Sequence, residues 1–238
     1  MKDNTAKSKN SNLSEKVADF MEKDIISERS DGERLPSEQQ MADQYGVSRT
    51  VIREALKKLS ERGLIDSKIG SGAFVTKPEA QNLSDVMYRI INMHNIDYSS
   101  AFDVRNILEA AAAKKAARFI TDEEIKNMEV ILEKLKDYDL PHDVRNEYDY
   151  QFHKLIADAS GNRLLAMLIA AMEKVLMDLI SISSAAEGAI CDGIFRHANI
   201  VAALKEHDPD LAEHMMVDHI YKSKKFYLEN IMNTDKEE

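Results

Sequence analysis

The first part of the chain begins with apolar residues at helical spacing. In residues 13–26, the apolar positions Val17, Phe20, Met21 and Ile25 recur every three or four residues. Such a pattern is typical of a helix with one face in a core and the other in water. We therefore expect an amphipathic helix here that serves as scaffold for the elements after it.

The next segment carries the start and stop signals of two short helices. Ser37 is followed three residues later by Gln40, the pattern of a capping box, which predicts that a helix begins there. Gly46 is able to adopt the left-handed conformation that ends a helix, and Ser48 is able to cap the next helix. The spacing predicts two helices joined by a tight turn, a helix-turn-helix.

The helix after this turn has one apolar and one basic face. Its inward positions recur at i, i+3, i+4 and i+7 and are Ile52, Ala55, Leu56 and Leu59. Its outward positions are Arg49, Thr50, Arg53 and Lys57. In a helix-turn-helix, the first residues of the second helix reach base edges in the major groove of DNA. We therefore expect the outward face to bind double-stranded DNA.

A hairpin signal follows the basic helix. Two short strand candidates, residues 64–69 and 73–76, flank the sequence Gly70-Ser71-Gly72. Glycines at a hairpin tip allow the backbone to approach DNA closely. Residues 13–77 thus predict a winged helix-turn-helix of three helices plus a β-hairpin wing, after a flexible N-terminal arm of residues 1–12.

The rest of the chain has helical periodicity almost throughout. Pro78 lies in a polar segment, residues 78–83, that we expect to be a linker. Residues 84–232 predict an antiparallel bundle of about seven helices, and residues 233–238 a flexible tail. The expected helices are residues 83–94, 99–119, 122–138, 142–159, 162–186, 191–206 and 208–232. The predicted fold class is mainly α.

The charge of the chain is divided unevenly between these two parts. The net charge of −10 disfavours DNA as a partner, because DNA binding uses Lys and Arg. Residues 1–77, however, hold 14 Lys and Arg against 13 Asp and Glu, whereas residues 78–238 hold 18 against 29. The local basic excess that fits a DNA-facing helix comes from Arg49, Arg53, Lys57, Lys58 and Arg62.

The composition indicates a globular protein of the cytoplasm. Hydrophobic residues make up 44% and charged residues 31% of the chain. The N-terminal residues 1–12 carry no apolar run like that of a signal peptide, and no stretch approaches the roughly 20 apolar residues that span a bilayer. The single cysteine, Cys191, excludes an intramolecular disulfide. We expect no membrane partner.

Four side chains of metal-ligand type lie on predicted helices of the second part. Asp149 and His153 are four residues apart and share one helical face, and His197 and His219 lie on the apolar faces of two other helices. One carboxylate and three imidazoles suit Zn, Ni, Co, Mn or Fe, with water or an anion completing the shell. The alternative is that these histidines are hydrogen-bonded core residues without a metal.

The first domain resembles the GntR family of winged-helix regulators. The resemblance rests on Leu35-Pro36-Ser37-Glu38, Met41-Ala42, Gly46-Val47-Ser48-Arg49, Arg53-Glu54-Ala55-Leu56, Leu59, Gly63-Leu64-Ile65 and Gly70-Ser71-Gly72-Ala73-Phe74-Val75. It implies that Arg49 and Arg53 contact operator bases and phosphates, Ser48 and Thr50 the DNA backbone, and that Gly70 lies at the wing tip. Gln39 stands where many members have a DNA-contacting arginine, so the resemblance carries over no operator sequence.

The second domain resembles the effector domain, called FCD, of the FadR-type branch of this family. The resemblance rests on Asp149-x-x-Phe152-His153 with Ser160-Gly161-Asn162, followed by His197 and His219. It implies that Asp149, His153, His197 and His219 bind a divalent metal, zinc foremost, beneath a ligand cavity. It also implies that Arg105 binds the carboxylate of an effector. The alternatives are an exposed ion pair of Arg105 with Glu109, and for Asn162 a helix cap in place of a pocket contact.

The resemblance implies a regulator, usually a repressor, that a small organic acid releases from operator DNA. Operators of helix-turn-helix proteins consist of two half-sites about one helical turn apart, so we expect a homodimer. One alternative makes the metal itself the signal. Another is a metal-dependent enzyme, although no candidate general base lies in a recognisable catalytic motif.

Overall fold

The computed structural model describes residues 3–68, 72–77 and 80–234. Its contacts divide the chain into two compact units, Met1–Glu79 and Ala80–Glu238. Each unit has its own hydrophobic core. Among the residues described, no helix is long and apolar enough to cross a lipid bilayer.

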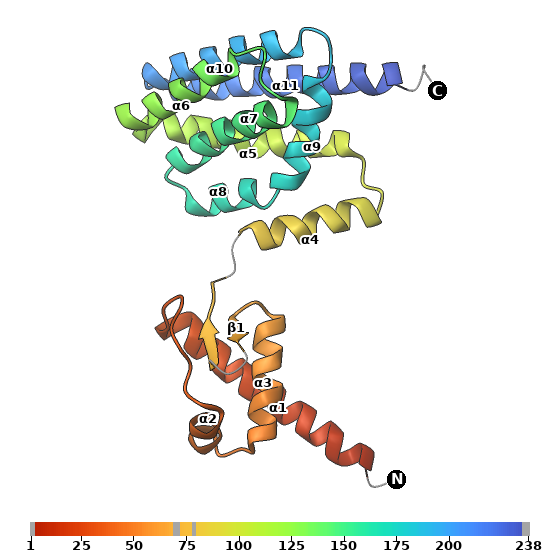
Figure 1. The fold of residues 1–238 in the computed structure, drawn as a ribbon. Coiled ribbons are helices and arrows are strands. Elements are labelled where there is room, and N and C mark those ends of the chain that lie inside the picture. Colours follow the sequence, from red (N-terminus) through yellow and green to blue (C-terminus); the bar gives the residue numbers. More distant parts are fainter. Residues whose placement is uncertain (1–2, 69–71, 78–79, 235–238) are drawn as a thin grey trace. The chain divides into compact units, whose positions relative to one another are not determined.

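Where the structure describes it, the first unit contains three helices and a two-stranded sheet (Figure 1). Its elements are α1 (Asp3–Glu28), α2 (Glu38–Tyr45), α3 (Arg49–Glu61), β1 (Ile65–Lys68) and β2 (Gly72–Val75). Helix α1 begins inside the segment expected to be an arm, since a polar sequence needs no apolar periodicity to be helical. The sequence pattern placed Phe20 on the buried face of this helix, and this is wrong. Phe20 is 63% exposed, because the buried face of α1 contains Val17, Ala18, Met21 and Ile25.

The start and the end of α2 follow the sequence signals. The Ser37 side chain accepts a hydrogen bond from the backbone N–H of Gln40, whose side chain accepts one from the Ser37 N–H, so the capping box is complete. Gly46 ends the helix at φ 64° and ψ 34°, in the left-handed region. Ser48 caps α3 by accepting from the N–H of Val51. These contacts confirm the predicted helix-turn-helix.

Strands β1 and β2 form an antiparallel hairpin after α3. Ile65 pairs with Val75 and Lys68 with Gly72, and a separate bridge joins Arg34 to Phe74. Gly72 has φ 106°, and a Cβ at this position would lie 3.2 Å from Nε of Arg34. The positive φ favours glycine here, and a side chain at this position would also displace the guanidinium of Arg34. The expected wing tip, Gly70, lies outside the described residues.

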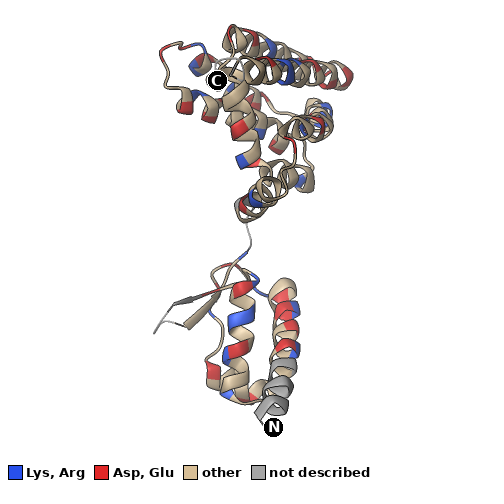
Figure 2. Ribbon diagram, turned by 90° about the vertical axis from the view of Figure 1, so that its right-hand side faces the viewer, with Lys and Arg blue, Asp and Glu red and all other residues tan. Residues whose placement is uncertain are grey.

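Charged side chains connect α1 to α3 across their surface, where Figure 2 shows basic and acidic positions alternating along both helices. Arg62 forms ion pairs with Glu15 at 2.5 Å, Asp19 at 2.9 Å and Glu22, and Lys58 pairs with Glu15 as well. Lys58 and Arg62 therefore neutralise acidic groups of α1 and do not add to the basic face. The outward face expected from the sequence did not include these two residues, but the local basic excess did, and their ion pairs reduce that excess.

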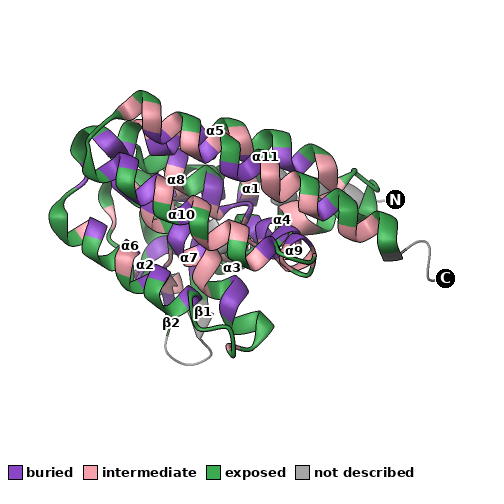
Figure 3. Cartoon of the chain, turned by 90° about the horizontal axis from the view of Figure 1, so that it is seen from above, coloured by how far each residue is buried: buried purple, intermediate pink, exposed green. Residues whose placement is uncertain are grey.

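The second unit is a helical bundle of eight helices within the described residues, one more than expected. They are α4 (Ala80–Met93), α5 (Tyr98–Phe119), α6 (Asp122–Leu135), α7 (His142–Ala159), α8 (Arg163–Ala170), α9 (Glu173–Ser184), α10 (Ala189–Lys205) and α11 (Pro209–Thr234). Helices α5 and α11 pack along each other, and buried residues recur along one side of the bundle helices (Figure 3). The early start of α4 makes residues 80–83 helical, where the sequence indicated a linker.

The extra helix arises because residues 162–186 form two helices and not one. The chain turns at Ala171 and Met172, which are 1% and 4% exposed. Met172 has φ −95° and ψ 2°, outside the helical region. No glycine or proline marks this turn, so its position follows from packing in the core and not from local sequence.

Candidate functional site

The basic face of α3 is the candidate DNA interface. Ser48, Arg49, Thr50 and Arg53 all lie on the surface, with the side chains of Arg49 and Arg53 56% and 60% exposed. The opposite face of α3 is buried through Val51, Ile52, Ala55 and Leu59. Burial of this face fixes the rotation of the helix about its axis. The four predicted contact residues consequently share one exposed face at the start of α3.

Helix α2 contributes a carboxylate to the same surface. Oε2 of Glu38 accepts a hydrogen bond from Nε of Arg53 at 2.8 Å and another from Nη2 of Arg49 at 3.4 Å. Gln39, the next residue, donates from Nε2 to Oδ1 of Asp43 at 2.9 Å. No local pattern in the sequence indicates the Glu38 contacts, because Glu38 is 11 residues from Arg49 and 15 residues from Arg53 along the chain.

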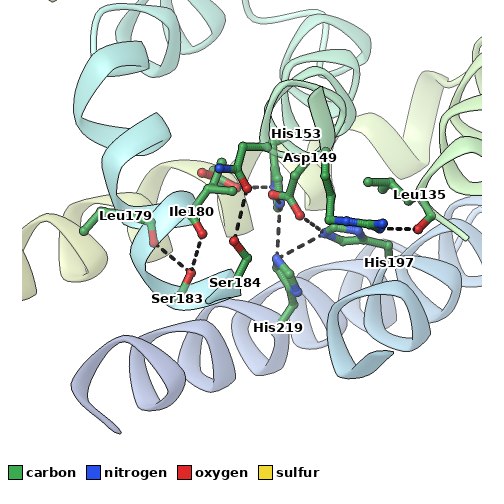
Figure 4. Close-up of polar contacts among 12 residues, drawn as sticks. Leu135, Asp149, His153, Leu179, Ile180, Ser183, Ser184, His197 and His219 are labelled. Carbon is green, nitrogen blue, oxygen red and sulfur yellow. Dashed lines mark hydrogen bonds and ion pairs between the residues drawn. The ribbon is translucent and has the colours of Figure 1, made fainter. Parts of the chain in front are cut away.

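The second candidate site lies in the core of the bundle, where three helices bring three imidazoles together (Figure 4). His153 comes from α7, His197 from α10 and His219 from α11, and all three are buried. Nε2 of His219 lies 3.2 Å from Nε2 of His153 and 3.3 Å from Nε2 of His197. The carboxylate of Asp149 lies 3.6 Å from Nε2 of His153 and 3.7 Å from Nε2 of His197. The structure thus brings together all four residues that the sequence pattern selected.

The donor set and its spacing fit a divalent metal. The three histidines offer nitrogen atoms that all lie within 4.8 Å of one another. Nitrogen ligands about 2.1 Å from a tetrahedral zinc ion are about 3.4 Å apart, close to the two Nε2–Nε2 distances given above. The four residues that would hold the ion are therefore Asp149, His153, His197 and His219, with Asp149 as the one partly exposed donor.

Burial keeps two of the three imidazoles, those of His197 and His219, in the form that binds metals. It lowers the pKa of His197 to about 4, and together with the neighbouring histidines it lowers the pKa of His219 well below the ordinary value. Both rings are consequently neutral near pH 7, with a nitrogen lone pair free to bind a cation.

A buried carboxylate supports the ring of His153. Oε2 of Glu109 lies 2.6 Å from Nδ1 of His153, and Oε1 accepts from Nε of Arg105 at 2.8 Å. Burial alone would raise the pKa of Glu109, but the charge of Arg105 and the contact with His153 outweigh it and lower this pKa to about 2. An ionised Glu109 favours the tautomer of His153 with its proton on Nδ1, which directs Nε2 toward the other histidines.

Arg105 belongs to this cluster and is not on the surface. The i,i+4 pair with Glu109 exists, but both side chains are almost fully buried, at 1% and 3% exposure, so the expected exposed alternative is wrong. Nη2 of Arg105 lies 3.0 Å from Nε2 of His153. Nη1 has no hydrogen-bond partner among the described residues. A buried guanidinium with an unused donor is a strong site for an anion.

Two small cavities, each of about 40 Å³, lie beside the cluster. One is bounded by Arg105, Asp149 and His219 together with Ser183, Ser184 and Ser223. The other is bounded by Asp149 and His197 with Arg145 and Asn146. Asp149 and Ser184 border both, so both cavities adjoin the partly exposed carboxylate of the candidate metal centre.

Asn162 is not part of this space. Its side-chain oxygen accepts a hydrogen bond from the N–H of Leu165 at 3.2 Å and caps α8. Neither cavity beside the histidines has Asn162 in its wall. The geometry therefore favours the helix-cap alternative over a ligand contact.

Sequence reasoning missed several polar residues around the cluster. Glu109 was visible only as the i+4 partner of Arg105, and its second contact, to His153, joins α5 to α7. Ser184 donates to Oδ1 of Asn146 at 3.1 Å, which joins α9 to α7. Such contacts between helices distant in the chain leave no local pattern.

Comparisons with known proteins give one family match in each unit. The model described as "Bacterial regulatory proteins, gntR family" matches residues 13–75, and the model of the FCD domain matches residues 100–222. The second match includes Arg105, Asp149 and all three histidines of the cluster.

Similar proteins include three bacterial regulators. The Exu regulon transcriptional regulator of Escherichia coli is 30% identical over 204 residues, which cover 81% of this chain and 75% of that protein. The transcriptional repressor NanR of E. coli is 28% identical, with 87% and 81% covered, and the regulator LutR of Bacillus subtilis is 29% identical, with 62% and 67% covered. A solved structure, Streptococcus agalactiae GntR, superposes with a TM-score of 0.71 at 25% identity, covering 89% of this chain and 99% of that chain.

Proposed function

Because the chain belongs to the GntR family of bacterial regulatory proteins and carries an FCD domain, we propose that it is a repressor released from DNA by a small organic acid. Its relatives are DNA-binding transcriptional regulators and not enzymes, and the same holds for this chain. The proposal adds three points: a metal at the histidine cluster, the chemistry of the effector and a homodimeric assembly.

One observation carries the proposal: a buried arginine with an unused donor beside three buried histidines. A metal ion held by these imidazoles would add positive charge close to the Arg105 guanidinium. Two cations so close in a buried site repel each other unless an anion lies between them. A carboxylate satisfies both, since it ligates a metal and accepts hydrogen bonds from a guanidinium.

The size and walls of the cavities indicate which acids fit. The volume of about 40 Å³ beside Arg105 is small, so a compact acid is favoured over a long chain. Ser184 and Ser223 line this space, and their hydroxyls would hydrogen-bond polar substituents of the acid. A short hydroxy acid combines these features.

A switch also requires that the acid prefer one arrangement of two DNA-binding units. Ligands shift an equilibrium only by their differential affinity for its states. Two copies of α3 on a pseudopalindromic operator supply such states, because the distance between the two copies decides whether both half-sites are bound. The proposed homodimer follows from this requirement.

Titrations of DNA with and without metal and acid test the proposal. A duplex selected by the full-length protein from a random library provides the DNA, and zinc with acetate, lactate or gluconate provides a series of acids of increasing size. We expect lactate with zinc to weaken DNA binding, and lactate without zinc to have little effect. Release by zinc alone would make the metal the signal. No effect of any acid at saturating zinc would contradict the proposed effector.

A further inference from the structure

Glu38 stands out on the DNA-binding face because it contributes a negative charge between two arginines. Its Oε2 atom accepts from Nε of Arg53 at 2.8 Å and from Nη2 of Arg49 at 3.4 Å. The carboxylate is itself partly exposed, at 33%, so it lies at the surface that would meet DNA. A negative charge at this position repels every phosphate that approaches the two arginines.

We propose that Glu38 is a specificity-determining residue of the DNA interface, which positions Arg49 and Arg53 for bases and weakens binding to DNA of any other sequence. The proposal rests on the assignment of α3 as the recognition helix. It goes beyond that assignment because Glu38 lies on α2 and acts through the arginines.

The hydrogen-bond geometry supports the positioning role. Arg53 uses Nε for Glu38, which leaves the edge formed by Nη1 and Nη2 free. Two terminal N–H groups of a guanidinium bind O6 and N7 of guanine together. A guanidinium held through Nε has fewer orientations to lose when it makes this contact. Glu38 therefore favours a base contact that depends on sequence.

The charge supports the second half of the proposal. Contacts of arginine with phosphates are the same for all sequences and supply most nonspecific affinity. A carboxylate beside the arginines weakens binding to every duplex, because it repels the phosphates. Only the correct base pair offsets this loss of affinity, through bidentate contacts with a guanidinium. Specificity is the difference between the affinities for the correct sequence and for other sequences. It therefore rises even if the affinity for both kinds of DNA falls.

The substitution Glu38→Gln tests this role in the full-length protein. Glutamine keeps the size of the side chain and removes its charge. Asp43→Asn is the matched control, because Asp43 is an exposed acid of the same helix whose hydrogen-bond donor is Gln39 and not an arginine. Thermal denaturation of both variants checks that the fold is retained.

The measured quantity is the ratio of the dissociation constants for a scrambled duplex and for a duplex that the wild-type protein selected from a random library. We expect Glu38→Gln to bind the scrambled duplex more tightly and to lower the ratio about fivefold or more, the effect of one base contact. Asp43→Asn should leave the ratio within twofold of wild type.

A fall in the ratio of less than threefold for Glu38→Gln, or an equal fall for Asp43→Asn, would overturn the proposal. Its failure is distinguishable from failure of the DNA-binding assignment. If the wild-type protein selects no sequence from the library, the recognition surface itself is wrong. If it selects one and the ratio of the variant is unchanged, only the role of Glu38 is wrong.

Discussion

Individual side chains of the two sites differ in how strongly their surroundings fix them. Arg53 is held at the surface by one ion pair, which contributes little to stability in water. His153, His197 and His219 are buried among one another and among other helices. Substitutions at the two sites should therefore have different effects. A change at Arg53 should alter DNA binding, and a change at the histidines should alter metal binding.

Replacement of Arg53 by alanine should weaken binding to the selected duplex by about 1–3 kcal/mol, because a base or phosphate contact of this exposed guanidinium is lost. The midpoint of thermal unfolding should not fall, since no buried group changes. A fluorescence-anisotropy titration measures the affinity, and circular dichroism measures the melting. Unchanged affinity would remove Arg53 from the interface.

Replacement of His219 by alanine should reduce zinc affinity by more than about 100-fold, since loss of a direct ligand exceeds the 10–100-fold effect of outer contacts. His214→Ala is the control: this residue is exposed on the same helix and should leave zinc binding unchanged. Competition with a chromogenic chelator measures the affinity, and circular dichroism verifies helix content. Equal zinc affinity of folded His219→Ala and wild type would rule out the proposed ligand set.

At the scale of secondary-structure elements, the sequence predicted those helix ends and buried faces that depend on neighbouring residues in the chain. The capping box of α2, the left-handed Gly46 and the buried stripe of α3 all lie within a few residues of their signals, and each is confirmed. The turn at Ala171–Met172 was missed because nothing local marks it. The gathering of Asp149 and the histidines was predicted from helical faces and a family resemblance, whereas the Glu109 and Glu38 contacts depend on helices meeting in space.

Removal of the α2 cap should loosen that helix alone. Ser37→Ala leaves the N–H of Gln40 without its side-chain acceptor and should lower the local stability of α2 by about 1 kcal/mol. Native-state hydrogen exchange of the α2 amides measures the change. Thr121→Ala removes the equivalent capping box of α6 and should affect α6 amides only. Equal loss of protection in both helices for either variant would show that the cap acts globally.

At the scale of the whole molecule, charge is divided between a nearly neutral first part and an acidic second part. The net charge is +1 for residues 1–77 and −11 for residues 78–238. Pairing of Lys58 and Arg62 with α1 leaves Arg49, Arg53 and Lys57 as the basic residues of the exposed α3 face. One such face offers few phosphate contacts, so the proposed homodimer, which brings two of them to the operator, should bind DNA more tightly at physiological salt than a single chain.

A change in the spacing of the two half-sites tests whether a dimer binds DNA through the exposed α3 faces of both of its chains. In a symmetric dimer, the two recognition helices enter major grooves on one side of the DNA, about one turn apart. Insertion of five base pairs at the centre of the selected duplex turns one half-site to the opposite side. The second contact then fails, and affinity should fall roughly 100-fold, as expected when a bivalent contact becomes a single one.

A single-site duplex provides the reference for this loss. The duplex with the insertion should bind about as tightly as a duplex that carries one half-site, and sedimentation should show two chains on the intact operator. If the insertion leaves affinity unchanged, each copy of α3 binds independently, and an effector that alters their separation could not release the operator. The homodimeric switch would then give way to a regulator whose effector acts within one chain.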